Sequence, residues 1–373
     1  MPALPNTEFR TRLLYVDIHS LIRPEILELS PYRVQEQKGY VKLDAMECPY
    51  PWPESLKTDW LDRLAKIEIN RYPDAELTTL KSAVKEFFEA PESAELLFGN
   101  GSDELIQMLL MAVAGQGRGI LSVEPTFTMY RIIARTLGLD YHAVDLREDF
   151  SLDADAMLEA VQRHQPAIVF LAYPNNPTGN NFEASAIETI IQQAPGLVVV
   201  DEAYYAFSPV TLLDQVGRFD NLLVMRTLSK IGMAGLRFGM LFGPGPIMQQ
   251  LGKIRLPYNI NALTQASIRF VMEHFAPFEK QVEQICQQRQ WLTKQLQQAA
   301  KVETVYPSMA NFLTFRSRAG EAGAIFEGLK AQKILIKILH GSSPRLTDCL
   351  RVTVGTEQEN QAFMEALNAI AVQ

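Results

Sequence analysis

The 373-residue chain has few cysteines, no excess of basic charge and no long apolar run. Its three cysteines, Cys48, Cys286 and Cys349, are too widely spaced to predict a disulfide framework or a zinc site, and they suit a reducing cytosol. A net charge of −8 argues against a nucleic-acid-binding protein, which needs a basic face. No apolar run is long enough to span a bilayer, and the first residues do not resemble a signal peptide. We therefore expect a cytoplasmic protein that binds no nucleic acid, membrane or metal.

Strand and helix patterns alternate through the middle of the chain. Short apolar runs predict seven strands, at residues 96–98, 120–123, 141–144, 167–172, 197–200, 222–225 and 238–242. Helical patterns fall between most of them, at residues 126–137, 153–164 and 184–193. This alternation predicts an α/β fold in which a mostly parallel seven-stranded sheet lies between helices. Ligands of such sheets bind at the carboxyl ends of the strands.

The flanking regions suggest three parts. Residues 1–55 are rich in proline and predict an arm that packs on the active site and on a small domain, and residues 56–264 form the large domain. Residues 265–373 predict a small α+β domain that includes a linking helix. We expect further helices at 59–69 and 77–88, one long helix from Thr264 to about Ala299, and helices at about 320–331 and 357–371. The expected strands of the small domain are 311–315, 334–338 and 350–354.

The segment Arg226–Arg237 follows one of the apolar runs and combines a lysine with two hydroxyls and an arginine. A lysine that leaves a buried strand end can be desolvated, which lowers its pKa and makes its amine nucleophilic. Lys230 could then form a Schiff base with an aldehyde, while Thr227, Ser229 and Arg237 could hold a phosphate. An aldehyde and a phosphate on one small molecule indicate pyridoxal phosphate (PLP). An ordinary strand followed by a polar turn fits this segment about equally well.

Other polar clusters also follow predicted strands. Ser102 and Asp103 open a helix after a glycine-containing turn, where free N–H groups bind phosphate. Ser102 could also be a plain helix cap, and the two roles are compatible. Phe127 could stack on a flat heterocycle, although core packing is the commoner role. Asn176 lies in a tight turn with two prolines and a glycine, and its amide could donate to a phenolate oxygen.

Asp201 ends the apolar run 197–200. Its carboxylate could pair with a protonated pyridine nitrogen and so keep the ring able to accept electrons. Tyr204, three residues later, could donate to the ring oxygen. An aspartate after a strand is more often a helix cap, and only its spacing from Asn176 and Lys230 favours the functional interpretation.

This order of residues resembles that of the fold-type-I PLP-dependent aminotransferases. The segments that carry the resemblance are Asn176-Pro177-Thr178-Gly179, Asp201 with Tyr204, Ser229-Lys230 and Arg237. Further segments, spread over nearly the whole chain, resemble the histidinol-phosphate aminotransferases: residues 29–32, 43–50, 71–73, 125–130 and 350–356.

The resemblance implies a role for each matching residue toward PLP. Lys230 would be the Schiff-base lysine and proton shuttle, Asp201 would hold the pyridine nitrogen, and Phe127 would stack on the ring. Asn176 and Tyr204 would hold the ring oxygen. The phosphate group would be bound by Ser102, Asp103, Thr227, Ser229 and Arg237, with Tyr72 reaching it from the other subunit of a homodimer.

The same resemblance implies transamination between L-histidinol phosphate and 2-oxoglutarate. Arg351 and Tyr32 would meet the anionic end of the substrate, together with Asn176, and Lys337 replaces a second arginine of the family. Two further departures are Met46, where many relatives have asparagine, and a segment between Lys230 and Arg237 that is one residue shorter. These departures leave open an aromatic aminotransferase or a decarboxylase of a phosphorylated amino acid.

Two other classes of protein fit less well. A nucleotide-dependent dehydrogenase would need a Gly-x-Gly-x-x-Gly turn after its first strand, which the sequence lacks. A non-catalytic PLP-binding regulator usually carries an attached DNA-binding domain, for which neither the charge nor the length suffices.

Overall fold

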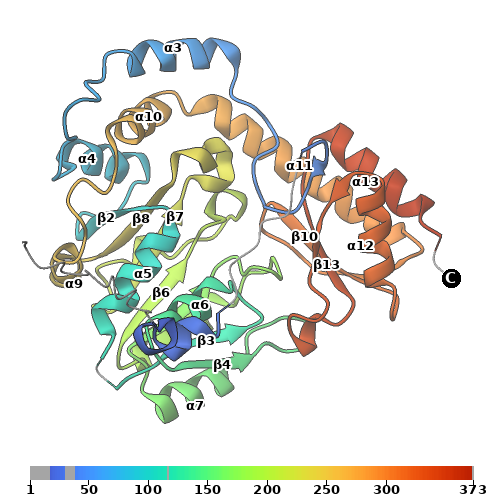
Figure 1. Ribbon diagram of the computed structural model, residues 1–373, viewed down its shortest axis with the longest axis horizontal. Coiled ribbons are helices and arrows are strands. Elements are labelled where there is room, and N and C mark those ends of the chain that lie inside the picture. Colours follow the sequence, from blue (N-terminus) through green and yellow to red (C-terminus); the bar gives the residue numbers. More distant parts are fainter. Residues whose placement is uncertain (1–16, 30–37, 116, 372–373) are drawn as a thin grey trace, which may run out of the picture. The chain divides into compact units, whose positions relative to one another are not determined.

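The computed structural model describes residues 17–29, 38–115 and 117–371. The chain divides into two compact units, Met1–Gln35 and Glu36–Gln373. The described part of the first unit contains two short helices, α1 (Ile18–Leu21) and α2 (Pro24–Leu27). The second unit contains the sheets and the remaining described helices (Figure 1).

Seven strands form the main sheet of the second unit, in the order β2-β8-β7-β6-β5-β3-β4. Strand β8 is antiparallel to both neighbours, and the other paired strands are parallel. The sheet is therefore mostly parallel, as the sequence predicted. The strands are β2 (Ala94–Asn100), β3 (Ile120–Glu124), β4 (Tyr141–Asp145), β5 (Ile168–Ala172), β6 (Leu197–Asp201), β7 (Leu222–Thr227) and β8 (Phe238–Pro244).

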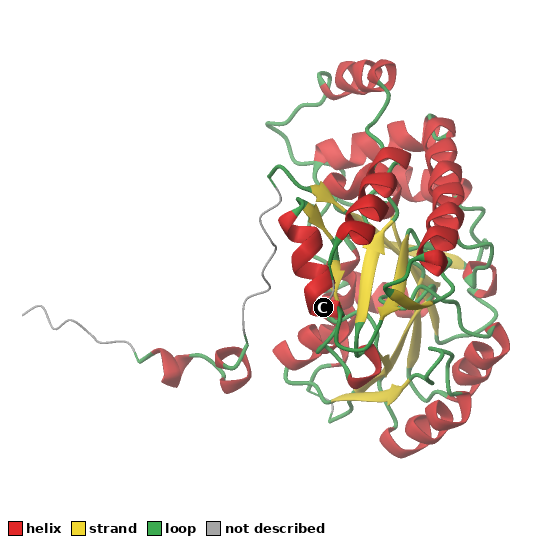
Figure 2. Cartoon of the chain, turned by 90° about the vertical axis from the view of Figure 1, so that its right-hand side faces the viewer, coloured by secondary structure: helices red, strands yellow, loops and turns green. Residues whose placement is uncertain are grey.

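Helices cover both faces of this sheet (Figure 2). Side chains alternate along the central strands, so that Leu222 and Val224 of β7 join one buried cluster while Leu223 and Met225 join another. Burial on both faces explains why these strands are continuous apolar runs. One cluster contains side chains of α5 (Ser102–Val113), α6 (Met129–Thr136) and α9 (Gly245–Gly252). The other contains side chains of α3 (Glu54–Leu64), α4 (Thr78–Phe87), α7 (Ala154–His164), α8 (Ala184–Gln193) and α10 (Ala262–Glu273).

A smaller sheet of four strands has the order β12-β13-β10-β9. Its strands are β9 (Val302–Val305), β10 (Phe312–Ser317), β12 (Lys337–Ile338) and β13 (Cys349–Thr353). A separate parallel pair joins β1 (Val41–Lys42) to β11 (Ile334–Leu335). A third apolar cluster contains Leu43 and side chains of three helices, α11 (Ala276–Gln298), α12 (Ala322–Ala331) and α13 (Glu357–Ala369).

The single long helix expected from Thr264 to Ala299 is wrong, because the chain forms two helices there. Helix α10 ends at Glu273, and α11 begins at Ala276 with a proline in its first turn. The ring of Pro277 would clash with the carbonyl group of the residue four positions earlier, which is Glu273. A continuous helix through this point is therefore excluded.

Three smaller expectations also need correction. The helix expected at 59–69 lies at Glu54–Leu64, where Pro53 precedes its first residue. The strand expected at 334–338 is split, since β11 pairs with β1 whereas β12 pairs with β13. The helix expected from Thr126 begins at Met129, because residues 125–128 form a loop at the end of β3.

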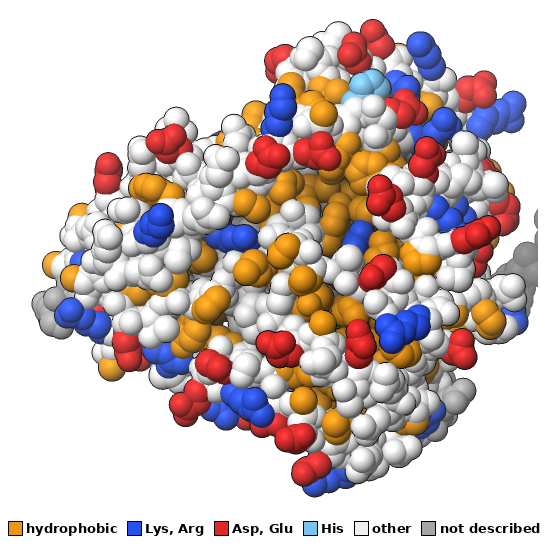
Figure 3. Space-filling model, turned by 180° about the vertical axis from the view of Figure 1, so that it is seen from behind, with side chains coloured by type: hydrophobic (Ala, Val, Ile, Leu, Met, Phe, Trp, Pro, Cys, Tyr) orange, Lys and Arg blue, Asp and Glu red, His pale blue; other side chains and the backbone are white. Residues whose placement is uncertain are grey.

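Three features of the described residues concern binding to nucleic acids, membranes and metals. On the face shown in Figure 3, lysine and arginine side chains lie among aspartate and glutamate side chains and form no continuous basic patch. None of the described helices is long and apolar enough to cross a membrane. The described residues also contain no group of three or more side chains placed to hold a metal ion.

Candidate active site

One cavity gathers ten of the candidate site residues predicted from the sequence. It lies at the carboxyl ends of β3, β5, β6 and β7, where a doubly wound sheet binds its ligands. The cavity is lined by Met46, Ser102, Asp103, Phe127, Ala172, Pro174, Asn176, Asp201, Ala203, Tyr204, Thr227, Ser229, Lys230 and Arg237.

Lys230 lies in a short irregular helical turn, η3 (Ser229–Met233), that begins two residues after the end of β7. Its ammonium nitrogen is 5.8 Å from the centre of the Tyr204 ring. Burial, and to a smaller extent the nearby charge of Arg351, lowers the pKa of Lys230 to about 8. A larger share of unprotonated amine is therefore present at neutral pH than for an ordinary lysine, which suits a nucleophile.

Asp201 ends β6 and is buried at the wall of the cavity. Its Oδ2 accepts a hydrogen bond of 2.6 Å from the Tyr130 hydroxyl, and its Oδ1 accepts one of 3.1 Å from the Ala203 amide. Burial raises the pKa of Asp201 to about 6. The turn that follows contains no helix capped by Asp201, since its first helical residue is Tyr205 and Tyr204 precedes it. The carboxylate is thus placed to meet a positively charged N–H group in the cavity.

Asn176 lies in the loop after β5 and is hydrogen-bonded to β13 of the small sheet. Its Oδ1 accepts a short hydrogen bond from Arg351, so its amide NH₂ remains available as a donor. The adjacent Asn175 accepts from Thr126 Oγ1 at 2.7 Å and donates to the Pro125 carbonyl at 3.0 Å. These two bonds tie the loop after β5 to the loop after β3, which carries Phe127.

The start of α5 forms an anion cradle with the end of β7. Gly101 precedes the helix with a φ of 87° and has no side chain to cap it, so Ser102 is not the cap and the first N–H groups are available. A Cβ atom on Gly101 would lie 2.5 Å from Arg237 Nη2. Arg237 also lies 3.3 Å from Asp103, and the hydroxyls of Thr227 and Ser229 are 2.8 Å apart.

These donors fit PLP. Free helix N–H groups, two hydroxyls and a guanidinium match a phosphate, and the aromatic ring of Phe127 suits a planar ring. Lys230 can bond to the aldehyde, and Asp201 can pair with a protonated pyridine. Tyr204 is also buried, which raises its pKa and keeps its hydroxyl a donor for the ring oxygen.

The residues expected to bind substrate or to come from a second subunit lie differently. Arg351 is buried on β13 and donates to Asn176 Oδ1 and, at 3.1 Å, to the backbone oxygen of Asp44. Lys337 is directly opposite Arg351 on β12, but it is exposed and does not line the cavity. Tyr72 is 81% exposed, stacks on Tyr258 and also lies outside the cavity. Tyr32 lies outside the described residues.

A segment that we call the strap, residues 41–52, contributes to the site. The backbone of Leu43 is hydrogen-bonded to Leu335 and to Thr353, and Met46 lines the cavity with a φ of 53°. Trp52 donates to the carbonyl of Gly232, inside the turn that carries Lys230, at 2.8 Å. The sequence singled out Met46 only as a departure from relatives, and the tie through Trp52 has no sequence signal beyond an aromatic residue in a proline-rich stretch.

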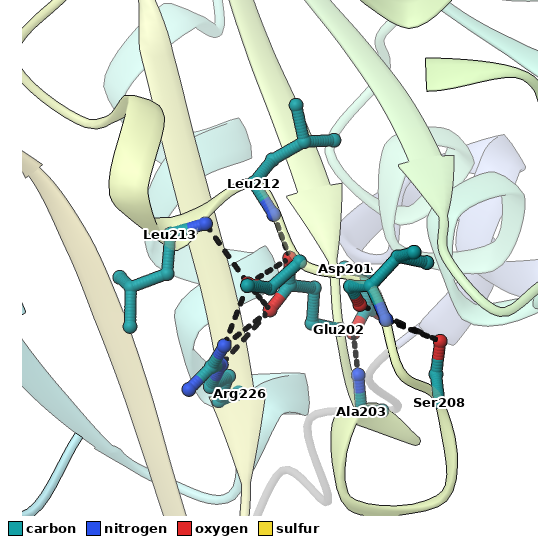
Figure 4. Close-up of polar contacts among 9 residues, drawn as sticks. Asp201, Glu202, Ala203, Ser208, Leu212, Leu213 and Arg226 are labelled. Atoms are coloured by element: carbon teal, nitrogen blue, oxygen red, sulfur yellow. Dashed lines mark hydrogen bonds and ion pairs between the residues drawn. The ribbon is translucent and has the colours of Figure 1, made fainter. Parts of the chain in front are cut away.

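Two further groups were not predicted as part of the site. Tyr130 was counted only within a resemblance segment, yet its hydroxyl is bonded to Asp201. Glu202 and Arg226 form a buried ion pair with a 2.7 Å contact beside Asp201 (Figure 4). The carboxylate of Glu202 also accepts hydrogen bonds from the Thr211 hydroxyl and the Leu212 amide. A charged residue directly after a buried strand was the available signal for this pair.

Comparison with known proteins identifies the family of the chain. The family model "Aminotransferase class I and II" matches residues 38–367. "Histidinol-phosphate aminotransferase 2" of Nitrosococcus oceani is 53% identical over 348 residues, which cover 93% of this chain and 96% of that protein. "Histidinol-phosphate aminotransferase" of Chromobacterium violaceum is 45% identical over 355 residues, covering 95% and 99%.

The fold also matches solved structures. The histidinol-phosphate aminotransferase from Sinorhizobium meliloti, solved in complex with pyridoxal-5'-phosphate, aligns with a TM-score of 0.85 and 22% identity over 94% of this chain and 97% of that chain. This likeness places the fold among the fold-type-I PLP-dependent aminotransferases. Because the family model covers most of the chain and the relatives match almost end to end, the chain belongs to the class I and II aminotransferases and, within them, to the histidinol-phosphate aminotransferases.

Proposed function

We propose that this PLP-dependent aminotransferase transfers the amino group of L-histidinol phosphate to 2-oxoglutarate, giving imidazole-acetol phosphate and L-glutamate in histidine biosynthesis. One observation carries the proposal: Arg351, from the small sheet, is hydrogen-bonded to Asn176 at the cavity that holds Lys230. A guanidinium beside the amine can bind the phosphate of one substrate and a carboxylate of the other. The near end-to-end similarity to proteins named for this reaction supports the same substrate.

The side chains of the cavity divide the work. When bound, PLP supplies an aldehyde that takes up the amino group and a ring that accepts electrons from the substrate carbon. Lys230 would hold the cofactor through its amine, and the amine would then take and return the proton at the amino-bearing carbon. Asp201 would keep a proton on the pyridine nitrogen, and Tyr204 and Asn176 would donate to the ring oxygen. Phe127 would pack on the ring.

The other predicted residues would anchor the cofactor and orient the substrate. The N–H groups of Ser102 and Asp103, together with Thr227, Ser229 and Arg237, would bind the cofactor phosphate. Arg351 would orient the anionic end of each substrate. We expect Tyr32 to help at that end, and Lys337 to add a positive charge near the phosphorylated substrate, because it shares a face of the small sheet with Arg351.

We further propose a homodimer with shared sites. Tyr72 stacks on Tyr258, and the segments that carry this pair expose further large apolar side chains, namely Ile69, Leu256 and Leu263. The two segments that carry them lie side by side, since Arg255 donates to the Ala75 carbonyl at 2.9 Å. The neighbouring Asn259 is hydrogen-bonded to Glu104 in the first turn of α5. An apolar face that borders the phosphate cradle suits a second copy whose Tyr72 reaches the cofactor phosphate.

The cysteines bear on the location of the protein in the cell. The three free cysteines suit the reducing cytoplasm that we propose.

The substrate is tested by supplying purified holoenzyme with 2-oxoglutarate and one amino donor at a time. We expect glutamate to form fastest with histidinol phosphate, more slowly with histidinol, which has no phosphate, and more slowly with phenylalanine. Preference for phenylalanine would instead identify an aromatic aminotransferase. Release of CO₂ from O-phosphothreonine without glutamate would identify a decarboxylase.

Cofactor attachment has a readout that needs no substrate. Borohydride reduction of the holoenzyme followed by peptide mapping should place the pyridoxyl label on Lys230. A label on another lysine would contradict the assignment.

A further inference from the structure

We propose that Tyr130 is a positioning residue whose hydroxyl keeps Asp201 ionised, so that the proton between this carboxylate and the cofactor ring stays on the ring nitrogen. This inference rests on the proposed function, because it assigns Tyr130 to the same PLP site. Tyr130 does not line the cavity and acts only through Asp201.

The position of Tyr130 is fixed from several sides. The residue lies in the first turns of α6 and is completely buried. Its ring stacks on Phe170 of β5, with the ring centres 4.6 Å apart, and meets the edge of Phe127 at 5.5 Å. The ring therefore has little freedom, and its hydroxyl is held 2.6 Å from Asp201 Oδ2. A single side chain thus supports both the carboxylate and the aromatic ring expected to meet the cofactor.

A hydrogen bond donated to a carboxylate stabilises its ionised form. Burial acts in the opposite direction on Asp201, and Tyr130 provides the largest opposing effect on its pKa. Removal of the hydroxyl would make the carboxylate more basic. A proton shared with a pyridine nitrogen would then move toward Asp201, leaving a neutral acid beside a neutral ring, which is a weaker electron acceptor.

The other groups around Asp201 do not replace this bond. The Ala203 amide donates to the other carboxylate oxygen. Lys230 favours the ionised form of Asp201 through its charge, whereas Asp103 opposes it. The charge of Asp201 also raises the pKa of the buried Tyr204 hydroxyl. Burial and the Asp201 charge both raise the pKa of Tyr130, so its hydroxyl remains a donor at any working pH.

The experiment uses holoenzyme loaded with PLP that carries ¹⁵N at the ring nitrogen. In the wild type, the ¹⁵N resonance should lie at the position of a protonated pyridine. In Tyr130→Phe it should move toward the unprotonated position, because one hydrogen bond to a charged group changes a proton distribution by about 10- to 100-fold. We expect kcat to fall by a similar factor while KM changes little.

Tyr141→Phe is the matched control, since it also removes a tyrosine hydroxyl that donates to a carboxylate, that of Glu124 at 3.0 Å, from a half-buried position outside the cavity. This variant should keep the wild-type resonance and kcat. If Tyr130→Phe does not fold, Tyr130→Met fills the space without a donor and should give the same displacement. An unchanged resonance in either folded, PLP-loaded Tyr130 variant would overturn the proposal. The resonance is read without substrate, so it is independent of whether histidinol phosphate proves to be the amino donor.

Discussion

Asp201 and Glu202 are consecutive buried carboxylates in opposite surroundings (Figure 4). Glu202 directly follows β6, and Arg226 contacts it through two nitrogens at 2.9 and 2.7 Å. Asp201 faces the cavity and receives its hydrogen bonds from Tyr130 and the Ala203 amide. A buried charge is costly unless it is paired. The fold pairs Glu202 internally with Arg226, whereas we propose that Asp201 is paired by the bound cofactor.

The largest expected effect comes from breaking the internal pair. Glu202→Leu leaves the guanidinium of Arg226 buried without its carboxylate, which should lower the free energy of unfolding by about 3–5 kcal/mol. Urea unfolding of the holoenzyme measures this loss. The double variant Glu202→Leu/Arg226→Leu should recover much of it. A loss below about 1 kcal/mol in the single variant would show that the pair is not energetically important.

Asp201→Asn should give the reverse pattern. The amide cannot hold a proton on the pyridine nitrogen, so kcat should fall by at least about 100- to 1000-fold, the usual cost of losing a key electrostatic contact. The cofactor-free variant should be no less stable than the wild type at pH 7, since a costly buried charge is gone. Steady-state kinetics of the holoenzyme measures the fall in kcat, and urea unfolding of the cofactor-free protein measures its stability. Near-normal turnover would show that Asp201 has only a structural role.

The pH dependence of stability sharpens the contrast. Asp201 keeps its proton up to about pH 6 in the folded, cofactor-free protein but only up to about pH 4 when unfolded. The folded state therefore binds more protons between pH 4 and 6, and the free energy of unfolding should fall as the pH rises through this window. The Asp201 contribution is roughly 2–3 kcal/mol. It is measured by taking the change in the free energy of unfolding between pH 4 and 6 in the wild type and subtracting the same change in Asp201→Asn. A difference near zero would contradict the buried-charge interpretation.

Arg226 and Arg351 extend the comparison to positive charges. Arg226 contacts a carboxylate, whereas the contacts of Arg351 include an amide oxygen and a backbone oxygen. Arg351→Ala should raise KM for both histidinol phosphate and glutamate by about 10- to 100-fold, the equivalent of one hydrogen bond to a charged group. The labelling of Lys230 by borohydride should persist.

Lys337→Ala should have the smallest effect, with a weaker increase in KM for histidinol phosphate than Arg351→Ala and little change for glutamate. Its exposed position screens its charge. Unchanged KM values in Arg351→Ala would place the anion site elsewhere.

The sequence could predict the residues whose chemistry interrupts an apolar run. Asp201 ends a strand that is buried on both faces, Lys230 and Asn176 follow two others, and parallel strands bring such positions together. The same logic predicted the sheet. Helix α5 was also predictable, although the cap proved to be Gly101, whose missing side chain leaves room for Arg237.

Contacts made across long stretches of chain could not be predicted. Tyr130 lies on the apolar side of an amphipathic helix and looks like an ordinary core residue, because its partner Asp201 is 71 positions away. Met46 and Trp52 lie in a stretch with little regular structure, so no periodicity fixes where their side chains point. Pro277 could have predicted the break between α10 and α11, but the helical spacing of apolar residues on both sides of it favoured one continuous helix.

If Arg351 binds the substrate as proposed, the strap makes the substrate-binding part of the protein discontinuous along the chain. Leu43 belongs to the apolar cluster that contains side chains of the small sheet. The backbone oxygen of Asp44 accepts a hydrogen bond from Arg351 of β13, although some 300 residues separate the two along the chain. An exchange of the C-terminal third between two relatives would therefore combine a foreign Arg351 with a native strap. A transplant that carries substrate preference from one relative to another should include residues 41–52 together with the C-terminal segment, because the two segments are hydrogen-bonded to each other.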